Sequence, residues 1–138
     1  MLPRFFHKLN QSLPFKPKTT AQQRGQQGED AALAYLQQQG LVCETRNYRC
    51  RGGEIDLVMR AGKADAATLV FVEVRVRKNA QHGSAAESVD RHKQRRLIVA
   101  AKHFLLTQTP LPACRFDVVA LDGGQIEWIK NAFEINTF

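Results

Sequence analysis

Two strand-like segments joined by a short loop constrain the fold of this chain most. Residues 54–59 (EIDLVM) and 68–77 (TLVFVEVRVR) are rich in apolar and β-branched residues, and only eight residues separate them. So short a connection predicts an antiparallel hairpin. If the loop is centred between Ala64 and Asp65, residues whose numbers add up to 129 face each other. Asp56 is then opposite Glu73.

Side chains alternate between the two faces of a strand, so each segment can be divided into faces. The first is expected to place Ile55, Leu57 and Met59 on one face, and Glu54, Asp56 and Val58 on the other. The second is expected to separate Val70, Val72, Val74 and Val76 from Leu69, Phe71, Glu73, Arg75 and Arg77. Asp56 and Glu73 become cross-strand neighbours with Cα atoms roughly 4.5–5.5 Å apart, and Arg75 points the same way as Glu73.

The rest of the chain supplies two helices and three more strands. Thr20 and Gln23 form a capping box before a helix over 21–39 that Gly40 ends. Ser84 and Glu87 predict a second helix that runs to about Leu106. Strands are predicted at 41–50, 115–121 and 125–130. The order α-β-β-β-α-β-β predicts an α/β fold, with a mixed central sheet flanked by two helices and parallel strands on either side of the second helix.

Two facing carboxylates repel each other, which suggests that a cation lies between them. Oxygen ligands of this kind suit Mg²⁺ or Mn²⁺, with water and a substrate phosphate in the remaining positions. Glu29 lies on the apolar stripe of the first helix, where it could join them. The alternative is a structural one, in which the acids are exposed and pair with Arg75 and Arg77. The joint occurrence of these features favours a metal site.

Charge and size suggest one domain with a basic arm. The 138 residues carry a net charge of +7, and residues 1–24 hold five Lys or Arg and no acid. We expect a flexible basic arm at 1–19 and one domain at 20–138. The arm suits a polyanion such as nucleic acid, or it is only a solvated tail.

Several classes of protein are disfavoured by composition. The apolar runs are too short to span a membrane, and the basic N-terminus lacks the apolar centre of a secretory signal. The three cysteines form no CxxC pair, and the four histidines show no zinc-binding spacing. A cytoplasmic protein with reduced thiols is therefore expected.

Five motifs in order resemble a known family: GQQGEDAALAYLQQQG, NYRCRGGEIDLVM, FVEVRVRK, SVDRHKQRRL and RFDVV. Together they closely resemble the YraN-like family of uncharacterised bacterial proteins over residues 24–134. That family is similar to Holliday-junction resolvases of the restriction-endonuclease-like fold, which carry a PD-(D/E)xK motif and an upstream helical Glu. The resemblance matches the catalytic set to Glu29, Asp56, Glu73 and Arg75, with the three acids as metal ligands. It also implies a homodimer, because a junction has two-fold symmetry, although the sequence marks no dimer face.

Arg75 departs from the family pattern of the resolvases, which have lysine at this position. Arginine is not deprotonated in proteins, so Arg75 can bind phosphate but cannot act as a base. Lys78 or Lys93 could supply an amine from another element.

Three functions remain open at this stage. The first is a Mg²⁺- or Mn²⁺-dependent endonuclease acting on branched or other structured DNA. The second is a nucleic-acid-binding module that has lost the chemistry, and the third is an interaction protein with a structural salt-bridge cluster. For the first two, the residues expected to contact nucleic acid are Arg49, Arg51, Arg77, Lys78, Arg91 and Lys93.

Overall fold

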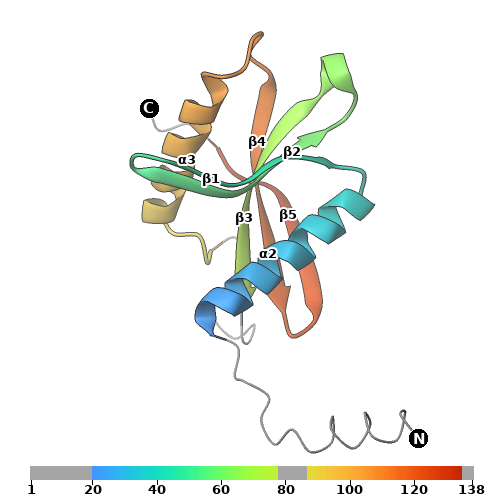
Figure 1. The fold of residues 1–138 in the computed structure, drawn as a ribbon, viewed down its shortest axis with the longest axis vertical. Helices are drawn as coiled ribbons and strands as arrows, with labels where there is room; N and C mark the ends of the chain where they lie inside the picture. The colour runs from blue at the N-terminus through green and yellow to red at the C-terminus, as the bar shows by residue number, and fades with distance from the viewer. Residues whose placement is uncertain (1–19, 78–86, 135–138) are drawn as a thin grey trace, which may run out of the picture.

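A five-stranded mixed sheet forms the centre of the fold, with strands in the spatial order β1-β2-β3-β4-β5 (Figure 1). The structure is a computed structural model that describes residues 20–77 and 87–134. The strands are β1 (Val42–Cys50), β2 (Gly53–Ala61), β3 (Thr68–Arg77), β4 (Ala113–Asp122) and β5 (Gln125–Phe133). The helices are α2 (Ala21–Gln38), α3 (Arg91–Leu105) and the short 3-10 helix η1 (Ala64–Ala66).

The sheet is antiparallel except at its centre, where β3 and β4 run parallel. The connection between these two strands contains α3. The predicted fold class is therefore confirmed, with the order α-β-β-β-α-β-β and a helix on each face of a mixed sheet. The predicted basic arm at 1–19 lies outside the described residues.

Each helix covers one face of the sheet and builds one layer of the core. Ala32 and Leu36 of α2 pack with residues of β2, β3 and β4 that include Leu57, Val72 and Val119. On the other face, residues of α3 pack with a second group of strand residues: Ile55, Val58, Leu69, Phe71, Phe116 and Val118. Because both faces are covered, the central strands are apolar on both sides. A charged residue on them is then unusual and stands out.

The start of α2 agrees with the prediction from sequence. The side chain of Thr20 accepts a hydrogen bond from the Gln23 N–H, and the Gln23 side chain accepts one from the Thr20 N–H. Further along, Gly28 lies against β3, and a Cβ on it would be 2.3 Å from Cγ2 of Val76. The missing side chain therefore lets α2 approach β3 closely next to Glu29.

The predicted start of α3 was wrong. The helix begins at Arg91, and its N-cap is Asp90, whose side chain accepts a hydrogen bond from the Lys93 N–H at 2.8 Å. Glu87 lies in a turn before the helix, and Ser84 is outside the described residues. Aspartate caps as well as serine does, and this start leaves Val89 buried in the core just before the cap.

The register of the β2–β3 hairpin is confirmed. Pairs run from Leu57 with Val72 to Ala61 with Thr68, and each pair adds up to 129. The ladder ends one residue short of Asp56 and Glu73. The predicted faces hold for β3 but were wrong for Ile55, which lies in the α3-side core and not with Leu57.

The error at Ile55 has a local cause. In β1, Arg46 pairs with Leu57 and Tyr48 pairs with Ile55, but the intervening Asn47 and Asp56 form no pair. Asn47 has a φ of 51°, in the left-handed region that asparagine tolerates better than most residues. Strand alternation therefore breaks at this point, and Ile55 turns to the other face.

Within residues 20–77 and 87–134, no helix has the length and hydrophobicity needed to cross a membrane.

Candidate active site

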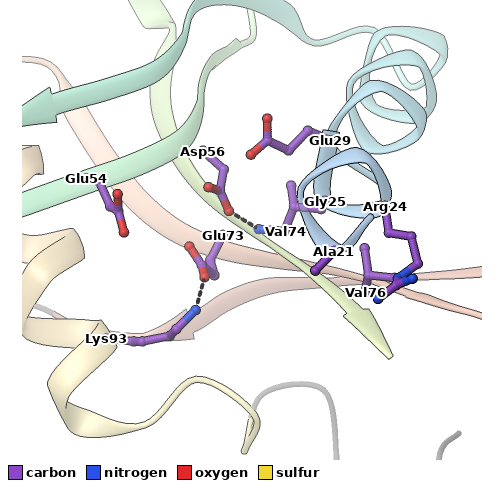
Figure 2. A pocket seen from close by; sticks show the side chains of 10 residues that line it. All are labelled: Ala21, Arg24, Gly25, Glu29, Glu54, Asp56, Glu73, Val74, Val76 and Lys93. Atoms are coloured by element: carbon purple, nitrogen blue, oxygen red, sulfur yellow. Dashed lines mark hydrogen bonds and ion pairs between the residues drawn. The ribbon is translucent and has the colours of Figure 1, made fainter. Parts of the chain in front are cut away.

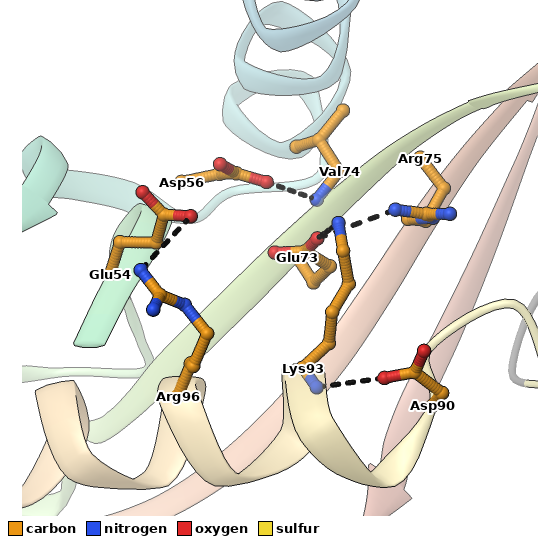
Figure 3. Close-up of polar contacts among 8 residues, drawn as sticks. All are labelled: Glu54, Asp56, Glu73, Val74, Arg75, Asp90, Lys93 and Arg96. Carbon is orange, nitrogen blue, oxygen red and sulfur yellow. Dashed lines mark hydrogen bonds and ion pairs between the residues drawn. The ribbon is translucent and has the colours of Figure 1, made fainter. Parts of the chain in front are cut away.

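Asp56 lies where β2 separates from β3. The backbone N–H of Val74 donates a hydrogen bond to Asp56 Oδ2 at 2.8 Å (Figure 3). The carboxylate thus takes the place that a backbone carbonyl of β2 would occupy if the ladder continued. The β2–β3 ladder ends at the pair Leu57 and Val72, so Asp56 lies at the point where the two strands begin to separate.

Glu73 is a buried acid on the α3 side of β3, with only 7% of its surface exposed. Its Oε1 is 3.1 Å from Nζ of Lys93, which reaches across from α3, and 3.9 Å from Nη1 of Arg75. Burial and the negative charge of Asp56 raise the pKa of Glu73 to about 7, although Lys93 acts in the opposite direction. Placing Glu73 next to Asp56 therefore disfavours the ionised form of Glu73.

Glu29 approaches the same acids from α2. Burial and the charge of Asp56 raise its pKa, while a hydrogen bond from Asn47 and the charge of Arg46 lower it. With the Asn47 amide oriented so that its nitrogen faces α2, it donates to both carboxylate oxygens of Glu29 at 3.2 Å. Figure 2 shows Asp56 between Glu29 and Glu73.

These three acids line one cavity of about 380 Å³. The remaining lining residues are Ala21, Arg24, Gly25, Glu54, Val74, Val76 and Lys93 (Figure 2). A second cavity of about 260 Å³ shares Glu54, Glu73 and Lys93 with the first and adds His92, Arg96 and Leu97 from α3. Arg75 lines neither of them, because its guanidinium lies on the far side of Glu73 from Asp56 (Figure 3).

The carboxylate oxygens of these three acids are the type of ligand that a hard divalent cation such as Mg²⁺ prefers. Burial and repulsion from Asp56 raise the pKa of Glu29 and of Glu73, and a cation would relieve the repulsion. Among the described residues, however, no three His, Cys, Asp or Glu side chains are close enough as they stand to hold one ion together. Asp56 and one neighbouring acid would provide the first ligands, and the third acid would have to move or act through water.

The chain was then compared with known proteins. The family described as "Uncharacterised protein family UPF0102" matches residues 28–121, which is more than half of the chain. The chain belongs to family UPF0102. This confirms the resemblance found in the sequence motifs, and the matched range contains Glu29, Asp56, Glu73 and Arg75.

Relatives within UPF0102 match over most of their length. The chain is 56% identical over 123 residues to a UPF0102 protein of Cupriavidus metallidurans, covering 89% of this chain and 90% of that protein. It is 57% identical over 119 residues to one from Herminiimonas arsenicoxydans, covering 86% and 93%. A third, from Saccharophagus degradans, is 54% identical over 114 residues, covering 81% and 93%. The names of these relatives state the family and no activity.

The predicted nucleic-acid contacts of this UPF0102 chain fall in two groups. Arg49 and Arg51 lie at the turn between β1 and β2, and Arg91 and Lys93 lie in the first turn of α3. Glu54 lies 4.0 Å from Arg49 of the first group and 3.8 Å from Arg96, a residue of α3 that was not among the predicted contacts. Of the four residues in these groups, Lys93 lines both cavities, and Arg49 is near Glu54, which also lines both. The remaining two residues are separate: Arg77 ends β3, and Lys78 lies outside the described residues.

Several residues of the site were not found from sequence. Asn47, Arg24 and Glu54 all contact the acids or line the cavity, and none was predicted to do so. Asn47 carried a usable signal, because asparagine is depleted in strands and tolerates the left-handed region. Glu54 carried a weaker signal, because strand alternation put it on the same face as Asp56. Arg24 carried none.

Proposed function

We propose that the protein is a metal-dependent nuclease that hydrolyses phosphodiester bonds in branched or other structured DNA, in the cytoplasm. The observation that supports this most strongly is the meeting of three acids from three elements. Glu29 comes from α2, Asp56 from β2 and Glu73 from β3, and all line one cavity with a lysine beside them. Keeping acids this close is costly for a structural role, because burial and repulsion both oppose ionisation.

In this proposal, Asp56 and one neighbouring acid, Glu73 or Glu29, bind Mg²⁺ or Mn²⁺ directly, and the third acid joins them after a movement or through water. When bound, such a cation lowers the pKa of a water molecule and offsets negative charge on the phosphate. The protein positions the ligands through its own contacts. The Val74 N–H orients Asp56, and Asn47 orients Glu29. Lys93 keeps a positive charge beside Glu73.

Basic residues around the cavities support a nucleic-acid substrate. Arg49, near the end of β1, and Arg51, in the turn to β2, are both exposed. Arg91 is exposed on the first turn of α3. Lysine and arginine at such positions neutralise phosphates and release counterions, which gives binding that depends strongly on salt. The preference for branched DNA comes from the resemblance to junction resolvases, which also suggests a homodimer.

One observation favours a second candidate, a nucleic-acid-binding module without chemistry. No three acids in the described part of the chain are close enough to share an ion as they stand. A site that had lost its metal would keep the fold and the basic surface. It would bind DNA with the same salt dependence but would not cleave it.

The proposal is tested by cleavage of four-way junction, flap and single-stranded DNA with Mg²⁺ or Mn²⁺. We expect the wild type to cleave at least the junction and Asp56→Asn to abolish cleavage. Asp65→Asn, the same change on an exposed residue of η1, is the matched control and should cleave normally. Salt-dependent binding of the wild type with no cleavage of any substrate would support the second candidate and overturn the first.

A further inference from the structure

We infer that Lys93, rather than Arg75, is the cation that contacts the reacting phosphate. The inference rests on the nuclease function proposed above and names the residue that stabilises charge in it. Lys93 lines both cavities, and its Nζ is 3.1 Å from Oε1 of Glu73. Nη1 of Arg75 is 3.9 Å from the same oxygen, beyond hydrogen-bond range, and Arg75 lines neither cavity.

The two cations approach Glu73 from different directions (Figure 3). Arg75 lies on the same strand as Glu73, two residues further on. Lys93 comes from α3 and ends beside the acids, across the Asp56–Glu73 pair from Glu29 (Figure 2). A phosphate that entered the larger cavity would therefore meet the ammonium of Lys93 on the side opposite α2. It would not meet the guanidinium of Arg75.

The start of α3 holds Lys93 in this position. Asp90 accepts a hydrogen bond from the backbone N–H of Lys93, which makes Lys93 the third residue of the helix. Gln94 reinforces the turn by donating from Nε2 to the carbonyl of Val89 at 3.0 Å. Val89 itself is buried in the core. The Asp90 cap and the burial of Val89 thus fix the backbone at Lys93. Only the Lys93 side chain has to become ordered when a phosphate binds.

The chemistry of the two side chains agrees with this assignment. An ammonium carries three donors, and one of them serves Glu73. The Lys93 side chain is 43% exposed, so a ligand can reach it, whereas the Arg75 side chain is 30% exposed. A compact ammonium also fits between two carboxylates and a phosphate more easily than a planar guanidinium.

The step that Lys93 assists is hydrolysis. The oxygen of a water molecule forms a bond to phosphorus while the bond from phosphorus to one ester oxygen breaks. The water releases a proton to solvent, and the departing oxygen takes one from solvent. Lys93 donates a hydrogen bond to a non-bridging phosphate oxygen, where negative charge builds up. The step needs only water and the divalent cation named above.

The test compares Lys93→Met, Lys93→Arg and Arg75→Met in the full chain. Lys63→Met is the charge-matched control, because Lys63 is exposed in the loop at the other end of the hairpin. Two readouts are taken on junction DNA. One is kcat with Mn²⁺, and the other is the salt dependence of binding with Ca²⁺ in place of Mn²⁺.

We expect Lys93→Met to lower kcat about 100-fold, as for loss of one donor to a charged transition state. It should also reduce the slope of log K against log salt by about one, since one phosphate contact is lost. Lys93→Arg should restore the slope and part of the rate. Arg75→Met should keep the slope and lower kcat less than about tenfold. Lys63→Met should change neither readout.

Two results would overturn the inference. One is a loss of rate in Arg75→Met as large as that in Lys93→Met, and the other is an unchanged salt slope in Lys93→Met. If the wild type cleaves nothing, the nuclease proposal fails by itself. The salt slopes then decide alone whether Lys93 contacts phosphate.

Discussion

In the metal-free protein, the free energy of unfolding should depend on pH because of Glu73. Replacing Glu73 by glutamine should remove that dependence. Its pKa is raised from the ordinary 4.5 to about 7, so the folded chain binds this proton more tightly than the unfolded chain. Between these two values the folded state holds a proton that the unfolded state has lost. The free energy of unfolding therefore falls as pH rises through this window. The contribution is complete below pH 4.5 and lost above about pH 7.

The size of the effect follows from the two pKa values. At about 1.4 kcal/mol for each pKa unit, the wild type should lose about 3 kcal/mol of stability between acid and neutral pH. Glutamine has the same shape and no proton to lose, so Glu73→Gln should be the more stable protein at pH 8. The gain is reduced by loss of the ion pair with Lys93, whose side chain is 43% exposed, so this cost is small.

The assay is urea unfolding at pH 5, 6, 7 and 8 with a chelator present. Glu54→Gln is the matched control, because Glu54 lines the same cavity but its side chain is 52% exposed. It should change stability little at any pH. A Glu73→Gln variant with the same pH slope as the wild type would refute the reasoning. A variant less stable than the wild type at pH 8 would support the structural salt-bridge hypothesis for this cluster.

Two further pairs of variants test the geometry of the site. In urea unfolding, Asp56→Ala should be about 1–3 kcal/mol less stable than Asp56→Asn, because only asparagine keeps an acceptor for the part-buried Val74 N–H. Equal stabilities of the two variants would mean that this hydrogen bond is unimportant. Gly53→Ala should lose about 1–3 kcal/mol, since a Cβ there would be 2.4 Å from the Arg96 carbonyl oxygen and 2.7 Å from the Ala100 nitrogen. A Cβ on Gly25 would have nothing within 4 Å, so Gly25→Ala should instead raise the free energy of unfolding by up to about 1 kcal/mol. A similar loss of stability in Gly53→Ala and Gly25→Ala would show that close packing is not the cause.

The hairpin shows what sequence could determine about this fold. Its register followed from loop length and strand alternation alone, because a shift of one residue would have turned every apolar side chain to the wrong face. The same argument brought Asp56 and Glu73 together. It failed at Ile55, because the break in alternation depends on the left-handed backbone of Asn47 in a neighbouring strand. Pairing rules within one hairpin do not include that strand.

The helix α3 shows a different limit. The Ser84 and Glu87 pattern predicted an earlier start for this helix than the one found at Arg91. Asp90 was selected by the burial of Val89, which is a property of the packed core. That choice matters for the site, because it places Lys93 in the first turn, with its backbone N–H bonded to Asp90. The sequence offered Lys78 or Lys93 as the source of an amine, and the packing of α3 places Lys93 beside Glu73.

The hydrogen bond from the Val74 N–H to Asp56 fastens the hairpin at the end away from its loop. The backbone ladder fastens the other end, where Ala61 pairs with Thr68. Insertions or deletions in residues 62–67 should therefore be absorbed locally, because neither attachment depends on that loop. Relatives could differ freely in loop length there and still place both acids at the same separation. Inserting or deleting one residue between Asp56 and Ala61 would not be absorbed in this way. It would move the Asp56 carboxylate away from the Val74 N–H on β3.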